Sequence, residues 1–336
     1  MTIDIGKKIK KTDLCPSALL ELQEKAYAID IKKLQKKINS FEEISCPACN
    51  SKKSKNFFKK YSFNFKLCQK CKTIFMSPRP SQKIMDEYYS NSENYKFWAK
   101  YIFPKSEKIR KNEIHKLWID RIITYVKKFK LKHKSLLEIG SGYGTFGNLV
   151  ITSNFFSKYL GIEPTPELSD VCKERKLKII NKKVEDVFLE EKFDIVVSFE
   201  VIEHIFNPQK FVRKINSLLK KNGSVFLSCP NGKGFDIEIL KEKSQSVDSE
   251  HVNLFNPESM KILLQKNNFE VLEIFTPGRL DAEIVRDEIL KGFSMKDEFL
   301  KKVLVNEWDK LGWPFQKFLA ENNLSSHMWV CAKKIK

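Results

Sequence analysis

The chain has 336 residues, of which 42% are hydrophobic and 31% are charged. This length predicts about two domains, and the apolar fraction is ample for a packed core. No stretch approaches the roughly eighteen consecutive apolar residues of a membrane helix, and the first residues lack the apolar centre of a signal peptide. We therefore expect a globular cytoplasmic protein without a membrane span.

The formal net charge of +19 is concentrated in the first part of the chain. Residues 1–135 contain 32 Lys and Arg against 13 Asp and Glu, whereas residues 136–336 contain 29 of each. An anionic partner such as a phosphate, a nucleotide or a nucleic acid could be steered to this basic part. The alternative is that the lysines only keep a solvated surface soluble.

The first predicted element is an amphipathic helix over residues 16–38, which starts at a proline and has apolar side chains near helical spacing. Residues 1–43 are therefore expected to form an N-terminal helical segment. Its predicted role is packing, or pairing with a second copy in a homodimer.

The eight cysteines include two close pairs, Cys46 with Cys49 and Cys68 with Cys71, separated by eighteen residues. In a reducing compartment this spacing favours a metal over disulfides. Each CxxC can grip one tetrahedral Zn²⁺ with two sulfurs, and four thiolates leave no open position. Residues 44–80 are therefore predicted to form a ribbon held by a structural zinc. A redox-active pair is the less favoured alternative, because neither pair lies between a strand and a helix.

A helical arm is predicted over residues 81–134. Ser81 can cap a short helix, and a long helical region is expected from Asn94 to Phe129. His115, in this region, is expected at the surface.

From residue 135 onward, short apolar runs alternate with helical patterns: SLLEIG, KYLGIE, LKII, FDIVVSF and GSVFLS. Five such runs separated by helices are typical of a parallel, doubly wound α/β sheet. Two more strands are expected at residues 269–275 and 325–334, with an insert at about 276–322. Residues 135–336 are therefore predicted to be one α/β domain.

The stretch LLEIGSGYGTFGNLV, residues 136–150, predicts a strand, a glycine turn and a helix. Gly140, Gly142 and Gly144 permit a sharp turn at the carboxyl end of the first strand, where open α/β sheets bind ligands. A dinucleotide site is one interpretation, since Gly142, Gly144 and Gly147 also satisfy GxGxxG.

Two acidic residues accompany the glycine turn. Glu138 precedes it, and this carboxylate suits an ammonium group better than a diphosphate, which disfavours the dinucleotide. Glu163 ends the second strand and can bind both hydroxyls of a ribose in either kind of site.

The segment SFEVIEHI, residues 198–205, brings Glu200, Glu203 and His204 to the end of the fourth strand. Their i, i+3, i+4 spacing would put them on one face of a helical turn, and such a cluster is costly to bury without a function. Hydride transfer does not require it. His251, in a later loop, is expected over the same crevice.

Through these motifs, residues 135–230 resemble a class I S-adenosylmethionine-dependent methyltransferase. The resemblance implies a Rossmann-like seven-stranded sheet and S-adenosylmethionine as the methyl donor. In that family the glycine loop holds the methionine part, the acidic end of the second strand holds the ribose, and residues near Glu185 frame the adenine. The cofactor-binding residues implied here are Glu138, Gly140, Ser141, Gly142, Tyr143, Gly144, Glu163, Pro164, Val184 and Phe199.

The cysteine ribbon and the FMSPRPS motif after it resemble those of bacterial methyltransferases found with surface-polysaccharide and sugar biosynthesis. This resemblance implies methylation of a hydroxyl on a sugar, nucleotide-sugar or glycan precursor. Such a hydroxyl is a poor nucleophile at neutral pH, so an imidazole must take its proton or a cation must lower its pKa. His251, His204 and Glu200 are the candidate catalytic residues.

Glu200, Glu203, His204 and His251 together also resemble the Mg²⁺ site of small-RNA 3′-end 2′-O-methyltransferases. Similar segments occur in ubiquinone-pathway O-methyltransferases. Two carboxylates and two imidazoles could bind Mg²⁺, Mn²⁺ or a softer divalent cation. The alternative is that these residues only order their loop by hydrogen bonds, as in relatives that use no metal.

Three further residues each have a functional and a structural interpretation, and a fourth has only a structural one. Arg279 and Asp281 could grip phosphate and sugar hydroxyls, or form an ordinary surface pair. His327 could face the crevice or be a hydrogen-bonded core residue, and Cys229 is predicted to be structural.

Two other functions are alternatives to methylation of a sugar. An RNA methyltransferase would use the ribbon and the basic first part to bind RNA, but that part lacks clustered arginines with interleaved aromatics beyond the hairpin. An inactive relative would recruit partners on a scaffold, and the intact glycine loop, Glu163 and acidic cluster argue against it.

Overall fold

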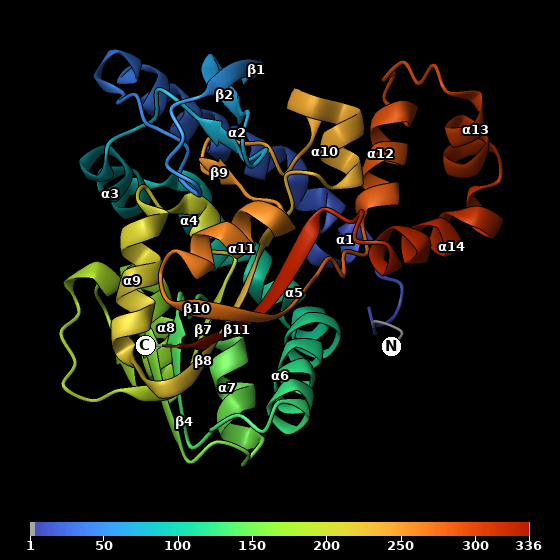
Figure 1. Ribbon diagram of the computed structural model, residues 1–336. Helices are drawn as coiled ribbons and strands as arrows, with labels where there is room; N and C mark the ends of the chain where they lie inside the picture. Colours follow the sequence, from blue (N-terminus) through green and yellow to red (C-terminus); the bar gives the residue numbers. More distant parts are fainter. Residues whose placement is uncertain (1–3, 336) are drawn as a thin grey trace.

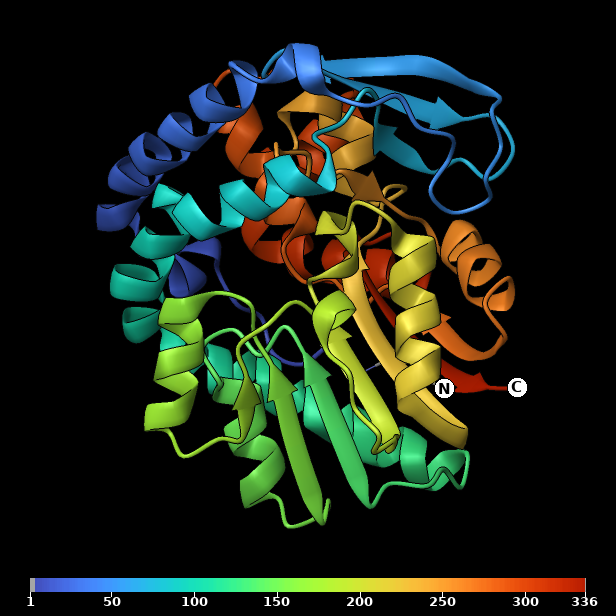
Figure 2. The ribbon, with the colours of Figure 1, turned by 90° about the vertical axis from the view of Figure 1, so that its left-hand side faces the viewer.

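A computed structural model describes residues 4–335. Two sheets organise this part of the chain, one of seven strands and one of four, and Figure 2 shows them at opposite ends of the molecule. Across the described residues, no helix has the length and apolar character needed to span a membrane.

The N-terminal segment contains α1 (Lys11–Leu14) and the long helix α2 (Ser17–Gln35), close to the predicted limits. Asp30 of α2 is fully buried, and its carboxylate accepts hydrogen bonds from the backbone N–H groups of Glu93 and Asn94 at 3.1 and 2.9 Å. A carboxylate is favourable at a helix N-terminus because the first N–H groups have no partner within the helix. This contact attaches α2 to the arm.

The cysteine ribbon is a small antiparallel sheet of order β1-β2-β3-β9. Its own strands are β1 (Ser54–Lys60), β2 (Phe63–Cys68) and β3 (Ile74–Met76). The fourth strand, β9 (Asn253–Leu254), comes from a distant part of the chain and pairs with β3, Phe75 lying opposite Asn253. The ribbon is therefore joined by backbone hydrogen bonds to the segment that carries His251.

The arm is helical, as its sequence predicts, but two turns are wider than an α-helix. Ser81 caps the first helix, because its hydroxyl accepts a hydrogen bond from the backbone N–H of Ile84. The elements in order are α3 (Gln82–Asn91), α4 (Glu93–Phe97), the π turn η2 (Trp98–Ile102), α5 (Phe103–Arg110), the π turn η3 (Lys111–His115) and α6 (Lys116–Lys128).

The seven-stranded sheet has the order β10-β11-β8-β7-β4-β5-β6. Its central neighbours are parallel, and β11 alone runs antiparallel to both of its neighbours. This is the Rossmann-like seven-stranded α/β sheet predicted from the sequence. The strands are β4 (Ser135–Ile139), β5 (Lys158–Ile162), β6 (Ile179–Ile180), β7 (Phe193–Phe199), β8 (Leu219–Pro230), β10 (Phe269–Phe275) and β11 (His327–Lys334).

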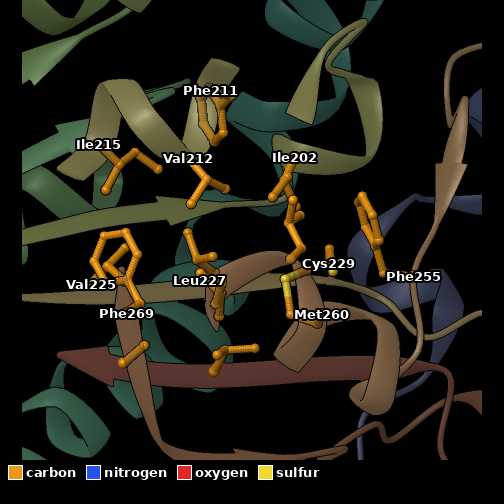
Figure 3. Close-up of a cluster of buried hydrophobic side chains, with 14 of the residues drawn as sticks. Ile202, Phe211, Val212, Ile215, Val225, Leu227, Cys229, Phe255, Met260 and Phe269 are labelled. Carbon is orange, nitrogen blue, oxygen red and sulfur yellow. The ribbon is translucent and has the colours of Figure 1, made fainter. Parts of the chain in front are cut away.

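Helices cover both faces of this sheet (Figure 1). On one face α6, α7 (Thr145–Thr152) and α8 (Pro166–Glu174) contribute to a buried apolar cluster. On the other face α9 (Pro208–Leu218) and α11 (Pro257–Gln265) pack with the ribbon. Figure 3 shows part of this second cluster, where side chains of α9 and α11 gather around Leu227 and Cys229 of β8. Cys229 is fully buried there.

The insert before β11 forms a separate helical cluster with α10 (Phe235–Leu240). Its helices are α12 (Asp281–Leu290), α13 (Glu298–Lys301) and α14 (Trp308–Glu321). Arg279 and Asp281, interpreted either as a substrate grip or as a surface pair, are instead bonded to other parts of the fold. Asp281 is buried and accepts a hydrogen bond from Gln316, while Arg279 donates to the backbone carbonyls of Lys7 and Glu113.

Candidate active site

A cavity of about 750 Å³ opens where β4, β5 and β7 end. Parallel strands expose their carboxyl ends along one edge, so residues far apart in sequence meet there. The cavity is lined by all the predicted cofactor residues except Gly144, namely Glu138, Gly140, Ser141, Gly142, Tyr143, Glu163, Pro164, Val184 and Phe199.

The glycine turn forms the floor of this cavity. Gly140 has φ +81°, and a Cβ added there would lie 2.5 Å from Cγ2 of Val201. Gly142 has φ +52° and open space where its Cβ would be. Both backbone angles are unfavourable for residues with a side chain. The turn therefore needs glycine, and its backbone is exposed to a ligand.

Two carboxylates lie beside the turn, and both are almost completely buried. Burial raises the pKa of Glu138 to about 8, although the Tyr159 hydroxyl donates a hydrogen bond to it. Burial also raises the pKa of Glu163, whose Oε2 accepts a hydrogen bond from the Gly142 backbone N–H at 2.7 Å. Neither carboxylate forms an ion pair with a cationic side chain of the described residues, so each is suited to receive donors from a ligand.

Glu200 follows the end of β7 with φ +55°, a strained angle for a residue that is not glycine. Its Oε1 accepts a hydrogen bond from the Ser228 hydroxyl at 2.6 Å and lies 2.8 Å from His327 Nε2. Burial alone would raise the pKa of Glu200, but the charge and hydrogen bond of His327 lower it to about 2. Glu200 therefore lines the cavity as a carboxylate paired with His327.

Glu203, His204 and His251 lie close together, each offering an atom within 4.8 Å of the others. Glu203 is 1% exposed, and in the described part of the chain neither of its carboxylate oxygens has a hydrogen-bond partner. Nδ1 of His204 is likewise buried without a partner. Burial, followed by the charge of His251, lowers the pKa of His204 to about 3. Of the predicted four-residue cluster, three members converge, whereas Glu200 is directed to His327.

His204 lines the cavity, and His251 lies against it with ring centroids 4.7 Å apart. Nδ1 of His251 is 2.9 Å from the Ser246 carbonyl oxygen, a good acceptor for a proton on that nitrogen. This tautomer leaves Nε2 unprotonated and able to accept a proton or bind a cation. His251 does not itself line the cavity.

The ribbon holds the two histidine segments in place. Arg79 is fully buried, and its guanidinium donates hydrogen bonds to the backbone carbonyls of Phe206 and Val252 at 3.2 and 2.9 Å. The side-chain amide of Asn253 donates to the carbonyls of Ile202, Glu203 and Ile205. The backbone next to His204 and the backbone next to His251 are therefore held by Arg79, which follows β3, and by Asn253 of β9.

Sequence reasoning missed the residues that close the cavity from the N-terminal side. Tyr89 of α3 meets the His204 ring at a centroid distance of 6.2 Å, and its buried hydroxyl has no partner among the described residues. His115, expected at the surface, lies in the cavity wall instead. Aromatic residues spaced along the arm were the available signal. The lining residues from this side are Gln82, Asp86, Tyr89, Ser90, Tyr95, Phe103, Glu107, Arg110, His115 and Trp118.

The four paired cysteines converge at the other side of the ribbon. All are free thiols, with 3.5 Å between the sulfurs of Cys46 and Cys71 and 3.6 Å between those of Cys49 and Cys68. A tetrahedral Zn²⁺ with bonds of about 2.3 Å would separate its sulfurs by about 3.8 Å. The donor set therefore fits zinc. Lys266, which follows α11, donates a hydrogen bond to the Cys49 carbonyl and so connects the ribbon to that helix.

Comparison with known proteins agrees with this geometry. Residues 110–274 match the model of a family described as a methyltransferase domain. The chain is similar to a ubiquinone biosynthesis O-methyltransferase of Pelagibacter ubique, with 31% identity over 30% of this chain and 44% of that protein. A protein of the same name from Coxiella burnetii is 27% identical over 36% of this chain and 51% of that one. The chain thus spans about half the length of these relatives.

Two solved structures illustrate the structural similarity. A phosphoethanolamine N-methyltransferase 2 of Haemonchus contortus, in complex with S-adenosyl-L-methionine, is 21% identical with a TM-score of 0.45, over 65% of this chain and 53% of that one. An S-adenosylmethionine-dependent methyltransferase of Clostridium acetobutylicum is 10% identical with a TM-score of 0.47, over 70% and 98%. Residues 110–274, which match the methyltransferase-domain model, include the glycine turn, Glu163 and the Glu203–His204 segment.

Proposed function

We propose that this protein transfers a methyl group from S-adenosylmethionine to a hydroxyl of a small acceptor, a sugar, nucleotide-sugar or glycan precursor. The observation that carries the proposal is the single cavity that joins the glycine turn and Glu163 to His204. A donor seated on the turn would lie beside an imidazole at the end of the neighbouring strand. Such a cavity suits alignment of two reactants, which contributes much of the rate of a transfer reaction.

The donor half is suited to S-adenosylmethionine in both charge and shape. When bound, this cofactor supplies an electrophilic methyl group on a positively charged sulfur. Glu138 would receive the ammonium group, Glu163 the ribose hydroxyls, and the wall near Val184 the adenine. Gly140 and Gly142 leave the floor open for close approach.

The acceptor half offers a route for the proton of the hydroxyl. Burial keeps His204 neutral, and His251 lies next to it with Nε2 available in the tautomer favoured by Ser246. We assign to this pair the removal of the proton from the acceptor hydroxyl. His204 lies at the cavity wall, and His251 lies behind it. Glu200 supports the wall through its pair with His327.

Glu203, His204 and His251 also suit a divalent cation. The unpartnered carboxylate of Glu203 and Nδ1 of His204 are the buried polar groups that a cation would satisfy. A carboxylate with two imidazoles favours Mn²⁺ or Zn²⁺ over Mg²⁺, which prefers oxygen ligands. A cation there would lower the pKa of a bound hydroxyl. In the ribbon, Cys46, Cys49, Cys68 and Cys71 would hold a structural zinc.

The polar side chains on the N-terminal wall support a polyhydroxylated acceptor. Tyr89 and Ser90 offer hydroxyls on this wall, and the Tyr89 ring meets that of His204. The relatives are named for ubiquinone biosynthesis, so a phenolic acceptor is the main competitor. A hydroxyl-rich wall matches hydroxyl-rich ligands better than an apolar ring, because its polar groups would otherwise stay unpaired.

The test is calorimetric titration with S-adenosylmethionine, followed by transfer of its labelled methyl group to a panel of nucleotide-sugars, free glycosides and catechols. We expect binding, and transfer to one sugar class. Absence of binding would contradict the donor assignment, whereas transfer to catechols alone would contradict the acceptor class. Mass spectrometry of nucleotide-sugars from cells with and without the gene would then identify the natural acceptor by one lost methyl group.

Chelation separates the two metal proposals. A weak chelator should remove a cation from Glu203, His204 and His251 and lower turnover, while metal analysis still finds one zinc per chain in the ribbon. Full turnover in chelator would contradict the cation and leave only the transfer of the proton to the histidines.

Zinc that persists when Cys68 is changed to Ser would contradict the four-cysteine site. Cys15→Ser is the matched control, because Cys15 lies outside the cluster.

A further inference from the structure

The cysteine ribbon carries an unbalanced charge. Residues 44–80 contain eight lysines and one arginine but no aspartate or glutamate, although 42 of the 336 residues of the chain are acidic. The fold itself uses three of these cations: Arg79 is fully buried, Lys60 donates to a backbone carbonyl of the loop before β9, and Lys66 pairs with Glu43 at 2.6 Å. The other six are exposed and form no ion pair with a carboxylate of the described residues: Lys52, Lys53, Lys55, Lys59, Lys70 and Lys72.

Five of these six lysines surround the point where the two cysteine pairs meet. Lys53 follows the first pair, and Lys70 lies within the second. The backbone N–H of Gln69 donates to the Lys53 carbonyl at 3.0 Å, and Lys55 lies opposite Leu67 in the β1–β2 ladder. Backbone contacts therefore bring the two cysteine knuckles side by side. We call the lysines around them the knuckle lysines: Lys52, Lys53, Lys55, Lys70 and Lys72.

The proposed zinc site offsets only part of this charge. Four thiolates around one Zn²⁺ carry a net charge of about −2, and five lysines surround them. Like charges that lie close together repel one another and destabilise a compact state. The ribbon therefore keeps a local positive field, which an anionic partner would neutralise.

The surface around the knuckle lysines offers charge and polar groups but little apolar area. Within residues 44–80, all of which the structure describes, Tyr61 at the hairpin turn is the one large hydrophobic residue that is exposed. A protein interface needs an apolar or aromatic centre, and binding to a lipid surface commonly inserts apolar side chains. The phosphates of a nucleic acid need neither, because lysines and small polar side chains contact them. Asn50 and Gln69 are exposed polar residues of this kind beside the knuckle lysines.

We propose that the knuckle lysines bind the sugar–phosphate backbone of a nucleic acid, without reading its sequence. None of these lysines lines the cavity of the candidate active site. Figure 2 shows β1 and β2 at the outer edge of the molecule, where a long ligand can reach them. This binding is separate from the proposed methyl transfer and depends on neither its donor nor its acceptor.

The experiment measures the fluorescence anisotropy of a labelled single-stranded RNA of about 20 nucleotides at salt concentrations between about 50 and 200 mM. Each phosphate that a lysine neutralises contributes about −0.7 to the slope of log affinity against log salt, so five contacts predict a slope of about −3.5. The triple variant Lys53→Gln, Lys55→Gln, Lys70→Gln removes three contacts. Its slope should be about −1.4, and its affinity at the lowest salt should fall at least about tenfold.

The matched control is the triple variant Lys296→Gln, Lys301→Gln, Lys310→Gln. These are exposed lysines of the insert, and they too form no ion pair with a carboxylate of the described residues. The control changes the net charge by the same amount, so its slope and affinity should stay those of the unaltered chain. Zinc analysis and thermal unfolding check that both variants keep the metal content and the fold.

Three results would overturn the proposal. Equal losses of affinity in the two triple variants would show that net charge alone explains the binding. Absence of RNA binding at about 50 mM salt would exclude the site directly. Binding to vesicles that contain phosphatidylglycerol, without binding to RNA, would assign the lysines to a membrane surface instead. A chain that binds RNA but not S-adenosylmethionine would contradict only the proposed function.

Discussion

The donor half and the acceptor half of the cavity are built in different ways. On the donor side, Glu138 and Gly140 lie at the end of β4 and Glu163 follows β5, so two neighbouring strands place all three. On the acceptor side, His204 and His251 come from two loops, and both loops are held by Arg79 and Asn253. A local motif therefore determines where the proposed cofactor would bind. Contacts between the ribbon and distant segments determine where His204 and His251 lie.

The largest expected effect tests the acceptor half. His251→Ala should lower turnover about 100-fold or more, as loss of a general base or cation ligand does, while affinity for S-adenosylmethionine stays within about twofold. Initial rates with the acceptor identified by the panel, together with calorimetry, measure both quantities. His133→Ala is the control, since His133 stacks on Phe155 far from the cluster in sequence and contacts. Unchanged turnover would remove His251 from the reaction.

The donor half is disrupted by Gly140→Ala. The added Cβ would meet Val201 at 2.5 Å with the backbone at φ +81°, so we expect at least about 10-fold weaker cofactor binding in calorimetry. Gly292→Ala is matched for backbone strain, because Gly292 has φ +101° but no atom near its Cβ position. If both variants bind the cofactor equally well, the turn does not form the floor of the donor site.

Arg79→Met tests whether the ribbon positions the histidines. It removes the guanidinium from the carbonyls of Phe206 and Val252, of which Val252 keeps only the Met76 N–H as donor, so turnover should fall about 10-fold with cofactor affinity unchanged. Arg79→Lys should recover part of the loss, and Arg213→Met, on an exposed part of α9, should have no effect. Equal losses of turnover and cofactor affinity would indicate general unfolding instead of positioning.

The smallest effect concerns pH and sharpens the role of Glu138. Its pKa of about 8 means that it is mostly protonated at neutral pH, and it must ionise to pair with an ammonium group. Binding then releases a proton, so affinity should increase by about fivefold to tenfold per pH unit from pH 6 to 7.5. The α-amino group of the cofactor stays mostly charged in this range. Calorimetry of Glu138→Gln should show a much flatter dependence, and identical slopes would exclude Glu138 as the partner.

The fold could be predicted because its signals are local. Apolar runs that alternate with helical patterns predicted the seven strands, and the residues of the glycine turn predicted a ligand at the end of β4. Backbone angles that favour glycine leave a trace in the sequence itself. The same holds for the cysteine pairs, whose spacing predicted the cluster that the structure brings together.

The tertiary structure decided the rest. It directed Glu200 to His327, brought Glu203, His204 and His251 together, and turned His115 from an expected surface residue into part of the cavity wall. The sequence by itself determined which strands and turns form, because hydrophobic period and glycine act over a few residues. Which side chains face one another across the cavity depended on packing between the arm, the ribbon and the sheet, and contacts between distant segments have no period that a single sequence reveals.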